Sequence, residues 1–262
     1  MENIKNISSL DDSLIKEFID LKNFYLDQEN NICAQSEKVV LKLLNSKVTI
    51  KKILASKDFF DTYYHFIKRR DANTILLEAD KALLTKIIGY NHHKGVFALA
   101  EKPPFVPIQE LGSNILIFNG LTSPENIGTL CRTAAAFNIN SLIFDQKSAS
   151  PYLKRSIRVS MGNVFKLKIY YSDNLERDLI TIKAMNYQLI GTANETDSKP
   201  MTAQYFQGKN ALIIGSEGHG MDPEIKALCH HTLKIKINDE VKHLNAAAAG
   251  AIFLHEASRS FF

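Results

Sequence analysis

The chain has few residues that could form covalent crosslinks and no segment suited to crossing a membrane. Its three cysteines, Cys33, Cys131 and Cys229, stand far apart in 262 residues. This spacing fits neither a disulfide framework nor a paired zinc site, and it favours a reducing compartment. Apolar runs such as residues 246–254 are much shorter than the ~20 residues that span a bilayer. The acidic start Met1–Glu2 lacks the basic segment of a secretion signal, so we expect a cytoplasmic protein without a membrane anchor.

A strong excess of one charge is also missing. Lysine and arginine number 32 against 28 acidic residues, which gives a net charge of +4. This balance permits a nucleic-acid partner without requiring one, because surface charge governs association rather than chemistry. With 45% hydrophobic and 23% charged residues, the composition is typical of a folded globular protein.

Proline is scarce, and three of the seven prolines stand together in residues 103–107. Neither a helix nor a strand continues easily through such a segment. We therefore expect two domains, residues 1–104 and 105–262.

Both expected domains alternate short apolar runs with helical patterns, which predicts an α/β fold. In the first domain the predicted strands are residues 31–34, 48–54, 74–77 and 96–100, and the predicted helices are residues 12–26, 37–44, 58–70 and 80–88. In the second domain the predicted strands are residues 115–118, 141–144, 188–192 and 211–214. The near-continuous apolar character of the later strands indicates a parallel sheet covered on both faces. Ligands of such a sheet bind beyond the carboxyl ends of its strands.

The loop after residues 115–118 leads into a well-marked helix start. Ser123 is a good N-cap, Pro124 suits the first helical position, and Glu125 complements the helix dipole. Asn126 and Arg132 then lie on the first turns, where an amide and a guanidinium can reach phosphate and ribose oxygens. Taken alone, the segment is more typical of an amphipathic helix with one surface arginine than of an anion-binding site.

Two further loops are unusual. After residues 211–214 comes Gly-Ser-Glu-Gly-His-Gly at residues 215–220, and small turn residues of this kind let a backbone approach a ligand closely. Its glycine spacing differs from that of a dinucleotide-binding loop, and Glu217 would repel a phosphate. Near the C-terminus, an apolar run around Leu233 passes through a polar loop into the alanine-rich residues 246–251. Small residues of this kind allow tight packing against a ligand, and a plain buried helix explains the alanines equally well.

In this order and spacing, the three segments resemble the SpoU family of RNA ribose 2′-O-methyltransferases, which belongs to the knotted SPOUT class. The resemblance rests on Asn-Ile-Gly-x-x-x-Arg-Thr-Ala at residues 126–134, Gly-Ser-Glu-Gly-x-Gly at residues 215–220, and Leu-Asn at residues 244–245. It covers about the last 150 residues. The first domain is similar to the ribosomal-protein-like substrate-binding domain of many members.

The resemblance implies a trefoil-knotted α/β methyltransferase domain at residues 105–262, an RNA substrate-binding domain at residues 1–104, and S-adenosylmethionine as cofactor. The knot would be a rare exception to the rule that chains do not thread loops. The residues expected to bind the cofactor, chiefly through backbone, are Thr192, Ala193, Ile214, Gly215, Gly220, Ile235, Ile237, Leu244 and Asn245. The family also forms homodimers, which makes Phe253 and Phe261 candidate interface residues.

The resemblance also implies roles in transferring a methyl group to a ribose 2′-hydroxyl of ribosomal or transfer RNA. Arg132 would bind the phosphate beside the target ribose, and because a guanidinium is a reluctant base, an electrostatic role is favoured over that of a base. Asn126 and Glu217 would orient Arg132 and the ribose, while Asn245 would fix the loop beside the methyl donor. The residues expected to face RNA are His92, His93, Lys94, Lys154 and Arg155.

The third motif departs from the family pattern. The family usually has Ile-Pro-Met, then a glycine two residues on, then Ser-Leu-Asn; here those places hold Ile235–Ile237, Asp239 and His243–Asn245. His243 is therefore a candidate catalytic residue that could replace the hydrogen bonds of the missing serine, act as a base, or do neither.

Two alternatives to the enzyme remain open. One is a knotted RNA-binding or ribosome-assembly factor with reduced catalysis, suggested by Lys236 and His243. The other is a nucleotide-dependent Rossmann enzyme, which is weakened by the absence of a ribose-binding acid. Metal binding at residues 92–93 or 229–231 is unfavourable because adjacent ligands rarely converge on one tetrahedral ion, so we expect no metal.

Overall fold

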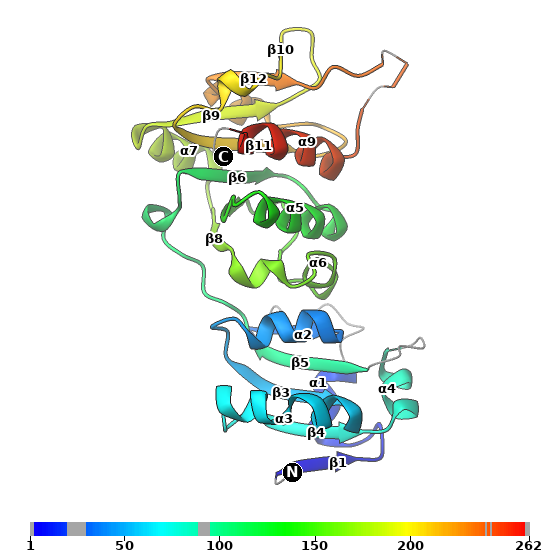
Figure 1. Ribbon diagram of the computed structural model, residues 1–262. Helices are drawn as coiled ribbons and strands as arrows, with labels where there is room; N and C mark the ends of the chain where they lie inside the picture. Colours follow the sequence, from blue (N-terminus) through cyan, green and yellow to red (C-terminus); the bar gives the residue numbers. More distant parts are fainter. Residues whose placement is uncertain (1–2, 20–29, 89–94, 239, 242, 260–262) are drawn as a thin grey trace. The chain divides into compact units, whose positions relative to one another are not determined.

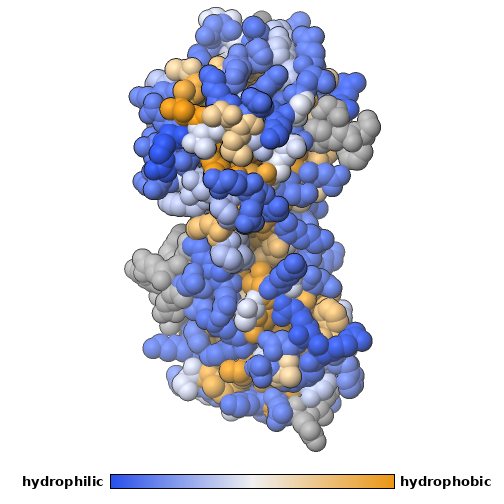
Figure 2. Space-filling view, turned by 90° about the vertical axis from the view of Figure 1, so that its left-hand side faces the viewer, coloured by the Kyte–Doolittle hydropathy of each residue, from blue (hydrophilic) through white to orange (hydrophobic). Residues whose placement is uncertain are grey.

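Two β-sheets organise the chain in the computed structural model (Figure 1). The structure describes residues 3–19, 30–88, 95–238, 240–241 and 243–259. Residues 1–103 and 152–165 form one compact unit, and residues 104–151 and 166–262 form the other. Within the described ranges, no helix is long and apolar enough to cross a membrane. On the face drawn in Figure 2, hydrophilic residues cover most of the surface and hydrophobic residues appear in small groups.

The first unit contains a mixed five-stranded sheet. Its strands, in spatial order, are β1 (Ile4–Ile7), β4 (Ile75–Ala79), β3 (Ile50–Ala55), β5 (Val96–Glu101) and β2 (Asn31–Gln35). Strands β1, β4 and β3 run parallel, whereas β5 is antiparallel to both β3 and β2. Its helices are α1 (Lys16–Ile19), α2 (Glu37–Leu44), α3 (Lys57–Arg70), α4 (Lys81–Ile88) and α6 (Lys154–Val159).

The predicted strands and helices of this unit are confirmed apart from their ends, with one exception. The helix predicted for residues 12–26 begins with a 3₁₀ turn at Ser13–Ile15 and continues as α1, and residues 20–26 lie outside the described part. The side chain of Asp12 accepts a hydrogen bond from the backbone of Leu14 at 2.9 Å, which caps this start.

Residues 152–165 are grouped differently from the division expected at the proline cluster. They follow β7 in sequence, yet they pack with the first unit. Lys42 Nζ on α2 donates to Asn163 Oδ1 at 2.5 Å. Helix α6 is one element of this segment, so the chain passes between the units more than once.

The second unit contains a parallel seven-stranded sheet. Its strands, in spatial order, are β10 (Lys199–Pro200), β12 (His231–Lys234), β9 (Tyr187–Thr192), β11 (Lys209–Gly215), β6 (Asn114–Asn119), β7 (Ser141–Phe144) and β8 (Lys168–Tyr171). Its helices are α5 (Pro124–Ala136), α7 (Leu175–Ala184), α8 (Pro223–Leu228) and α9 (Ala246–Ser258). The α/β class and the parallel sheet predicted for this part are confirmed.

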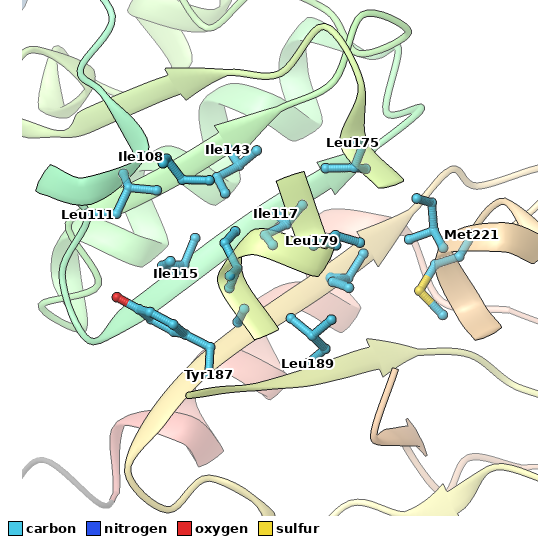
Figure 3. Packing of buried hydrophobic residues seen from close by; sticks show 14 residues of the cluster. Ile108, Leu111, Ile115, Ile117, Ile143, Leu175, Leu179, Tyr187, Leu189 and Met221 are labelled. Atoms are coloured by element: carbon cyan, nitrogen blue, oxygen red, sulfur yellow. The ribbon is translucent and has the colours of Figure 1, made fainter. Parts of the chain in front are cut away.

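Helices cover both faces of this sheet because successive strand side chains point to opposite sides. On one face, side chains such as Ile117 and Leu189 pack with Leu179 of α7 (Figure 3). On the other face, α5 packs against α9, and α9 contacts β11 (Figure 1). Gly250 allows this approach, since a Cβ there would lie 2.4 Å from Leu130 Cδ2 and 2.6 Å from Ile214 Cδ1. The last helix is thereby held close to the carboxyl end of β11.

Candidate active site

The start of α5 is built as the sequence predicts. Ser123 Oγ accepts a hydrogen bond from the backbone of Asn126 at 3.3 Å, and Pro124 occupies the first turn. The side chain of Asn126 is buried, with 7% of its surface exposed. Arg132 is exposed on the same helix, and it makes no hydrogen bond or ion pair with the described residues. The helix therefore presents one buried amide and one unpaired cation.

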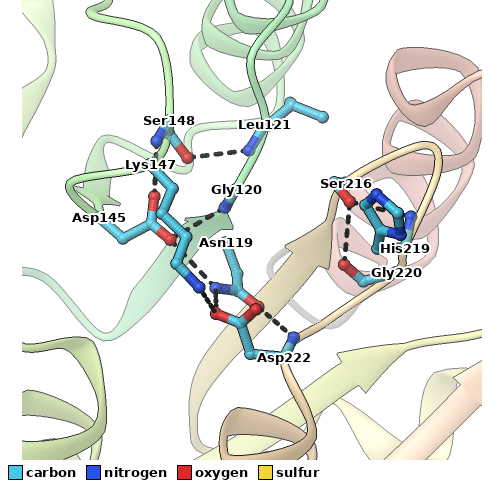
Figure 4. Close-up of polar contacts among 10 residues, drawn as sticks. All are labelled: Asn119, Gly120, Leu121, Asp145, Lys147, Ser148, Ser216, His219, Gly220 and Asp222. Carbon is cyan, nitrogen blue, oxygen red and sulfur yellow. Dashed lines mark hydrogen bonds and ion pairs between the residues drawn. The ribbon is translucent and has the colours of Figure 1, made fainter.

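The glycine-rich segment after β11 closes into a tight turn. Ser216 and Gly220 exchange backbone hydrogen bonds of 2.9 and 3.0 Å, and Ser216 Oγ contacts Gly220 and His219 (Figure 4). Gly220 has a φ of +70°, which favours glycine. Gly215 has no room for a side chain, because a Cβ would lie 2.3 Å from the Gly220 carbonyl carbon. The turn thus exposes Glu217 at its tip.

Asn245 connects the start of α9 to this turn. Its Oδ1 accepts hydrogen bonds from the backbones of Ala247 and Ala248, at 2.9 and 3.2 Å, and so caps the helix. Its Nδ2 donates to Asn126 Oδ1 at 3.1 Å and to Glu217 Oε1 at 2.9 Å. One side chain therefore both begins a helix and joins the other two motifs.

Asn126, Glu217 and Asn245 form one hydrogen-bonded group, which we call the amide–carboxylate triad. Asn126 Nδ2 also donates to Glu217 Oε1, so this one carboxylate oxygen accepts from two amides. Hydrogen bonds to an ionised acceptor are the stronger kind, and here they fix the direction of the carboxylate. Glu217 Oε2 has no hydrogen-bond partner in the described part of the chain. Within the triad, Glu217 Oε2 is therefore the oxygen that can accept a hydrogen bond, and then a proton, from a hydroxyl group.

A cavity of about 290 Å³ adjoins the triad. Its wall includes all but one of the residues predicted to bind the cofactor: Thr192, Ala193, Ile214, Gly215, Gly220, Ile235, Ile237 and Leu244. Asn245 is the exception; its side chain belongs to the triad, and it is not part of the wall. His243 and Glu217 also line the cavity, whereas Arg132 does not. The structure therefore gathers the predicted cofactor residues at the carboxyl edge of the sheet.

The wall suits a nucleoside. Apolar side chains such as Ile235, Leu244 and Phe253 supply surface for a flat ring, and Gly215 leaves backbone exposed where a side chain would otherwise stand. A mostly apolar wall with a few placed polar groups is the usual form of a cofactor site.

A family model described as the SpoU rRNA Methylase family matches residues 113–255, more than half of the chain. The chain belongs to this family. Among its relatives is the 23S rRNA (guanosine-2′-O-)-methyltransferase RlmB of Acinetobacter baylyi, which is 28% identical over 70% of this chain and 77% of the relative.

Solved structures agree with the SpoU fold. The rRNA methyltransferase of Sinorhizobium meliloti with bound AdoMet superposes with a TM-score of 0.85 at 20% identity and covers 99% of both chains. The SpoU methyltransferase AviRb of Streptomyces viridochromogenes, in complex with the cofactor AdoMet, gives 0.79 at 21% identity, over 95% of this chain and 99% of that one. At such identities the likeness concerns the fold.

A second polar network in this SpoU domain was missed by sequence reasoning. Asn119, at the end of β6, accepts from the Asp222 backbone at 2.7 Å and donates to Asp222 Oδ2 at 2.9 Å (Figure 4). Asn119 also donates to the buried Asp145 at 3.0 Å. Lys147 donates to Asp222 at 2.8 Å, and the hydrogen bonds from Lys147 and Asn119 lower the pKa of Asp222. The network fastens the far end of the glycine turn to the neighbouring strand.

Helix α8 begins at Pro223, directly after Asp222. The Asp222 side chain makes no capping hydrogen bond to that helix. It faces Asn119 and Lys147 instead. The local sequence around Asp222 gives no sign of this contact with the neighbouring strand.

Of the residues predicted to face RNA, only Lys154 and Arg155 belong to the described part of the chain. His92, His93 and Lys94 lie outside the described residues. Lys154 is half-buried in the first unit, with its ammonium 6.0 Å from the ring centre of Phe97, whereas Arg155 is exposed. RNA binding by these residues stays a prediction.

Phe253 does not lie on an exposed interface face. It is 2% exposed and lines the cavity, because the helix periodicity turns it towards β11 rather than outward. Phe261 lies outside the described residues. Within the described part, no group of three or more histidine, cysteine or acidic residues could hold a metal ion.

Proposed function

We propose that this chain transfers a methyl group from S-adenosylmethionine to a ribose 2′-hydroxyl of ribosomal or transfer RNA. Membership of the SpoU family supports a methyltransferase, and the name of the Acinetobacter relative supports guanosine in 23S rRNA as the first substrate to test. The observation that carries the proposal is the amide–carboxylate triad beside the cavity. Three segments far apart in sequence meet there through side chains.

The cavity fits the proposed cofactor. Its apolar surface suits the adenine, and its polar backbone near Gly215 suits the ribose. S-adenosylmethionine supplies an activated methyl group, so the protein has to position the acceptor hydroxyl and receive its proton. The neighbouring enzymes of known structure were solved with AdoMet, which supports the same cofactor here.

The triad and Arg132 have separate roles, one towards the ribose hydroxyl and the other towards the adjacent phosphate. Two amides fix Glu217, so its second oxygen can accept a hydrogen bond from the ribose hydroxyl, hold the hydroxyl in line with the methyl donor and take its proton as the methyl group is transferred. Arg132 holds the adjacent phosphate by charge, for which an exposed guanidinium without a protein partner in the described ranges is suited. A guanidinium is a poor base, so this role is electrostatic.

His243 is the second candidate for contact with the ribose, since it is exposed and lines the cavity. Replacing it by alanine measures its role. A tenfold or larger fall in rate assigns His243 to the reaction, and an unchanged rate leaves the triad and Arg132 as the working set.

The remaining parts of the proposal concern the whole protein. We propose that residues 1–104 bind the RNA substrate, that the domain of residues 105–262 is knotted and pairs as a homodimer, and that the protein works in the cytoplasm. The close packing of α9 against α5 and β11 is compatible with a threaded C-terminus.

The test is methylation by the purified protein. We expect it to transfer labelled methyl groups from S-adenosylmethionine to RNA from a strain that lacks its gene, at one ribose identified by mass spectrometry. Arg132→Ala should abolish transfer while leaving cofactor affinity nearly intact. Absence of cofactor binding at millimolar concentration in calorimetry would overturn the enzyme and favour an RNA-binding assembly factor.

A further inference from the structure

A second charged cluster lies on the cavity wall, away from the triad in the sequence. The loop after β9 carries Glu195 and Asp197, and both pair with Lys226 of α8. The Lys226–Asp197 distance is 3.5 Å, and Glu195 lies closer still. Lys226 and Glu195 are both part of the wall. The cavity wall therefore carries an ion pair, and its residues come from the loop after β9 and from α8, which do not contribute to the triad.

Lys226 is exceptional among the groups that face the cavity. It is the one lysine or arginine among the described residues of the wall. Its side chain is only 26% exposed, and the hydrogen bond to Glu195 raises the pKa of Lys226, so it stays charged at neutral pH. Glu217, the other wall glutamate, is already held by the two amides of the triad. Among the described residues of the wall, only the Lys226–Glu195 pair offers both signs of charge together.

We propose that Lys226 and Glu195 recognise the amino-acid end of the cofactor, an inference that rests on the proposed function. An α-amino acid group carries a carboxylate and an ammonium one carbon apart. A lysine next to a glutamate is complementary to it, with Lys226 binding the carboxylate and Glu195 accepting from the ammonium. The pair thereby selects ligands with a free amino-acid tail over nucleosides that lack it.

The pair can bind without being broken. An ammonium has three N–H donors, so Lys226 can keep Glu195 while it donates to a ligand carboxylate. The loop is held in place independently of the pair, since Lys234 Nζ donates to the Glu195 carbonyl at 3.1 Å and the Ala193 backbone donates to Leu233 at 3.0 Å. Removing the Lys226 charge should therefore leave the loop and the nucleoside part of the cavity in place.

The experiment compares two ligands that differ only at this end. S-adenosylhomocysteine carries the amino-acid tail, and 5′-methylthioadenosine has a methyl group there instead. Calorimetry should give a dissociation constant for S-adenosylhomocysteine about tenfold higher in Lys226→Met than in the unaltered protein, because the variant loses one charge-assisted hydrogen bond to the ligand. The constant for 5′-methylthioadenosine should change less than about twofold. Glu195→Gln should show the same selectivity.

The control is Lys166→Met, which removes an exposed lysine of the same unit that lies outside the wall and makes no hydrogen bond or ion pair with the described residues. It should alter neither constant. Equal weakening of both ligands in Lys226→Met would mean that Lys226 merely supports the cavity, and no weakening would mean that it does not touch the tail; either overturns the inference. Failure of the unaltered protein to bind S-adenosylhomocysteine would instead overturn the proposed function itself, and thermal unfolding of each variant identifies a folding defect.

Discussion

At the scale of single residues, the site depends on side chains with more than one partner. Glu217 accepts from two amides, and Asn245 caps α9 while it donates to the other two members of the triad. Because Asn245 also caps α9 and Asn126 is buried, truncating either asparagine disturbs folding and chemistry together. Glu217 is exposed and caps no helix, so it gives the cleaner test of the chemistry.

We expect Glu217→Ala to slow methyl transfer about 100-fold or more, because the acceptor that orients the ribose hydroxyl is lost. Single-turnover rates with labelled S-adenosylmethionine measure this, alongside the affinity for S-adenosylhomocysteine, which should stay within about threefold. Glu176→Ala on α7, also exposed, should match the unaltered protein. A variant with an undiminished rate would remove Glu217 from the mechanism.

Lys147 offers a prediction about pH. Hydrogen bonds from Lys147 and Asn119 lower the pKa of Asp222 in the folded state, so the ionised carboxylate stabilises the fold above its ordinary pKa. This stabilisation is lost as the pH falls through the lowered pKa. At neutral pH, Lys147→Met should therefore have a lower free energy of unfolding in urea than the unaltered protein. The difference between the two proteins should disappear as the pH falls from about 5 to about 2. Lys183→Met is the matched control, and a gap independent of pH would refute the assignment.

At the scale of elements, the carboxyl ends of β6 and β11 and the starts of α5 and α9 hold the site. The sequence predicts these four elements well, because their apolar runs and caps are strong local signals. Strands β1, β8 and β10 are missed: β1 and β8 are short and half-exposed at sheet edges, and β10 has two residues. Their strand character comes from pairing with neighbours rather than from their own pattern.

The α5–α9 contact gives a prediction at this scale. Alanine at position 250 favours the helix by about 1 kcal/mol, yet its methyl group would overlap Leu130 and Ile214, which are 0% and 2% exposed and cannot turn into solvent. We expect Gly250→Ala to lose about 1–2 kcal/mol of unfolding free energy in urea. Ala248→Ser, at an exposed position of α9, should change it by less than about 0.7 kcal/mol. A more stable Gly250→Ala would show that the packing is looser than described.

At the scale of the whole molecule, two α/β units share one chain. Sequence reasoning finds the α/β class and the parallel sheet of the second unit, because composition and strand pattern specify a fold class. It does not find the antiparallel pairing of β5 in the first unit, nor the packing of residues 152–165 there, since both depend on contacts between segments distant in sequence. For the site, the motifs indicate Asn126, Glu217 and Asn245, whereas nothing local indicates Asn119 or Lys226.

RNA binding supplies the prediction at this scale. If Lys94 contacts a phosphate, Lys94→Ala should reduce the slope of log affinity against log salt by about one, measured by filter binding of the full-length protein between about 50 and 200 mM salt. Lys154→Met should reduce the slope by less than Lys94→Ala, because the Lys154 side chain is half-buried with its ammonium over Phe97. A larger reduction of the slope in Lys154→Met than in Lys94→Ala would identify Lys154 as the main phosphate contact.

The two tasks of Asn245 bear on how this protein can diverge. A lineage that abandoned catalysis could exchange Glu217 more readily than Asn245, since Glu217 is an exposed turn residue that caps no helix, whereas an asparagine or similar cap at position 245 prevents fraying of the last helix. Variation at position 217 with asparagine retained at position 245 would therefore identify related proteins that have lost the activity. Joint retention of both would mark selection for the reaction.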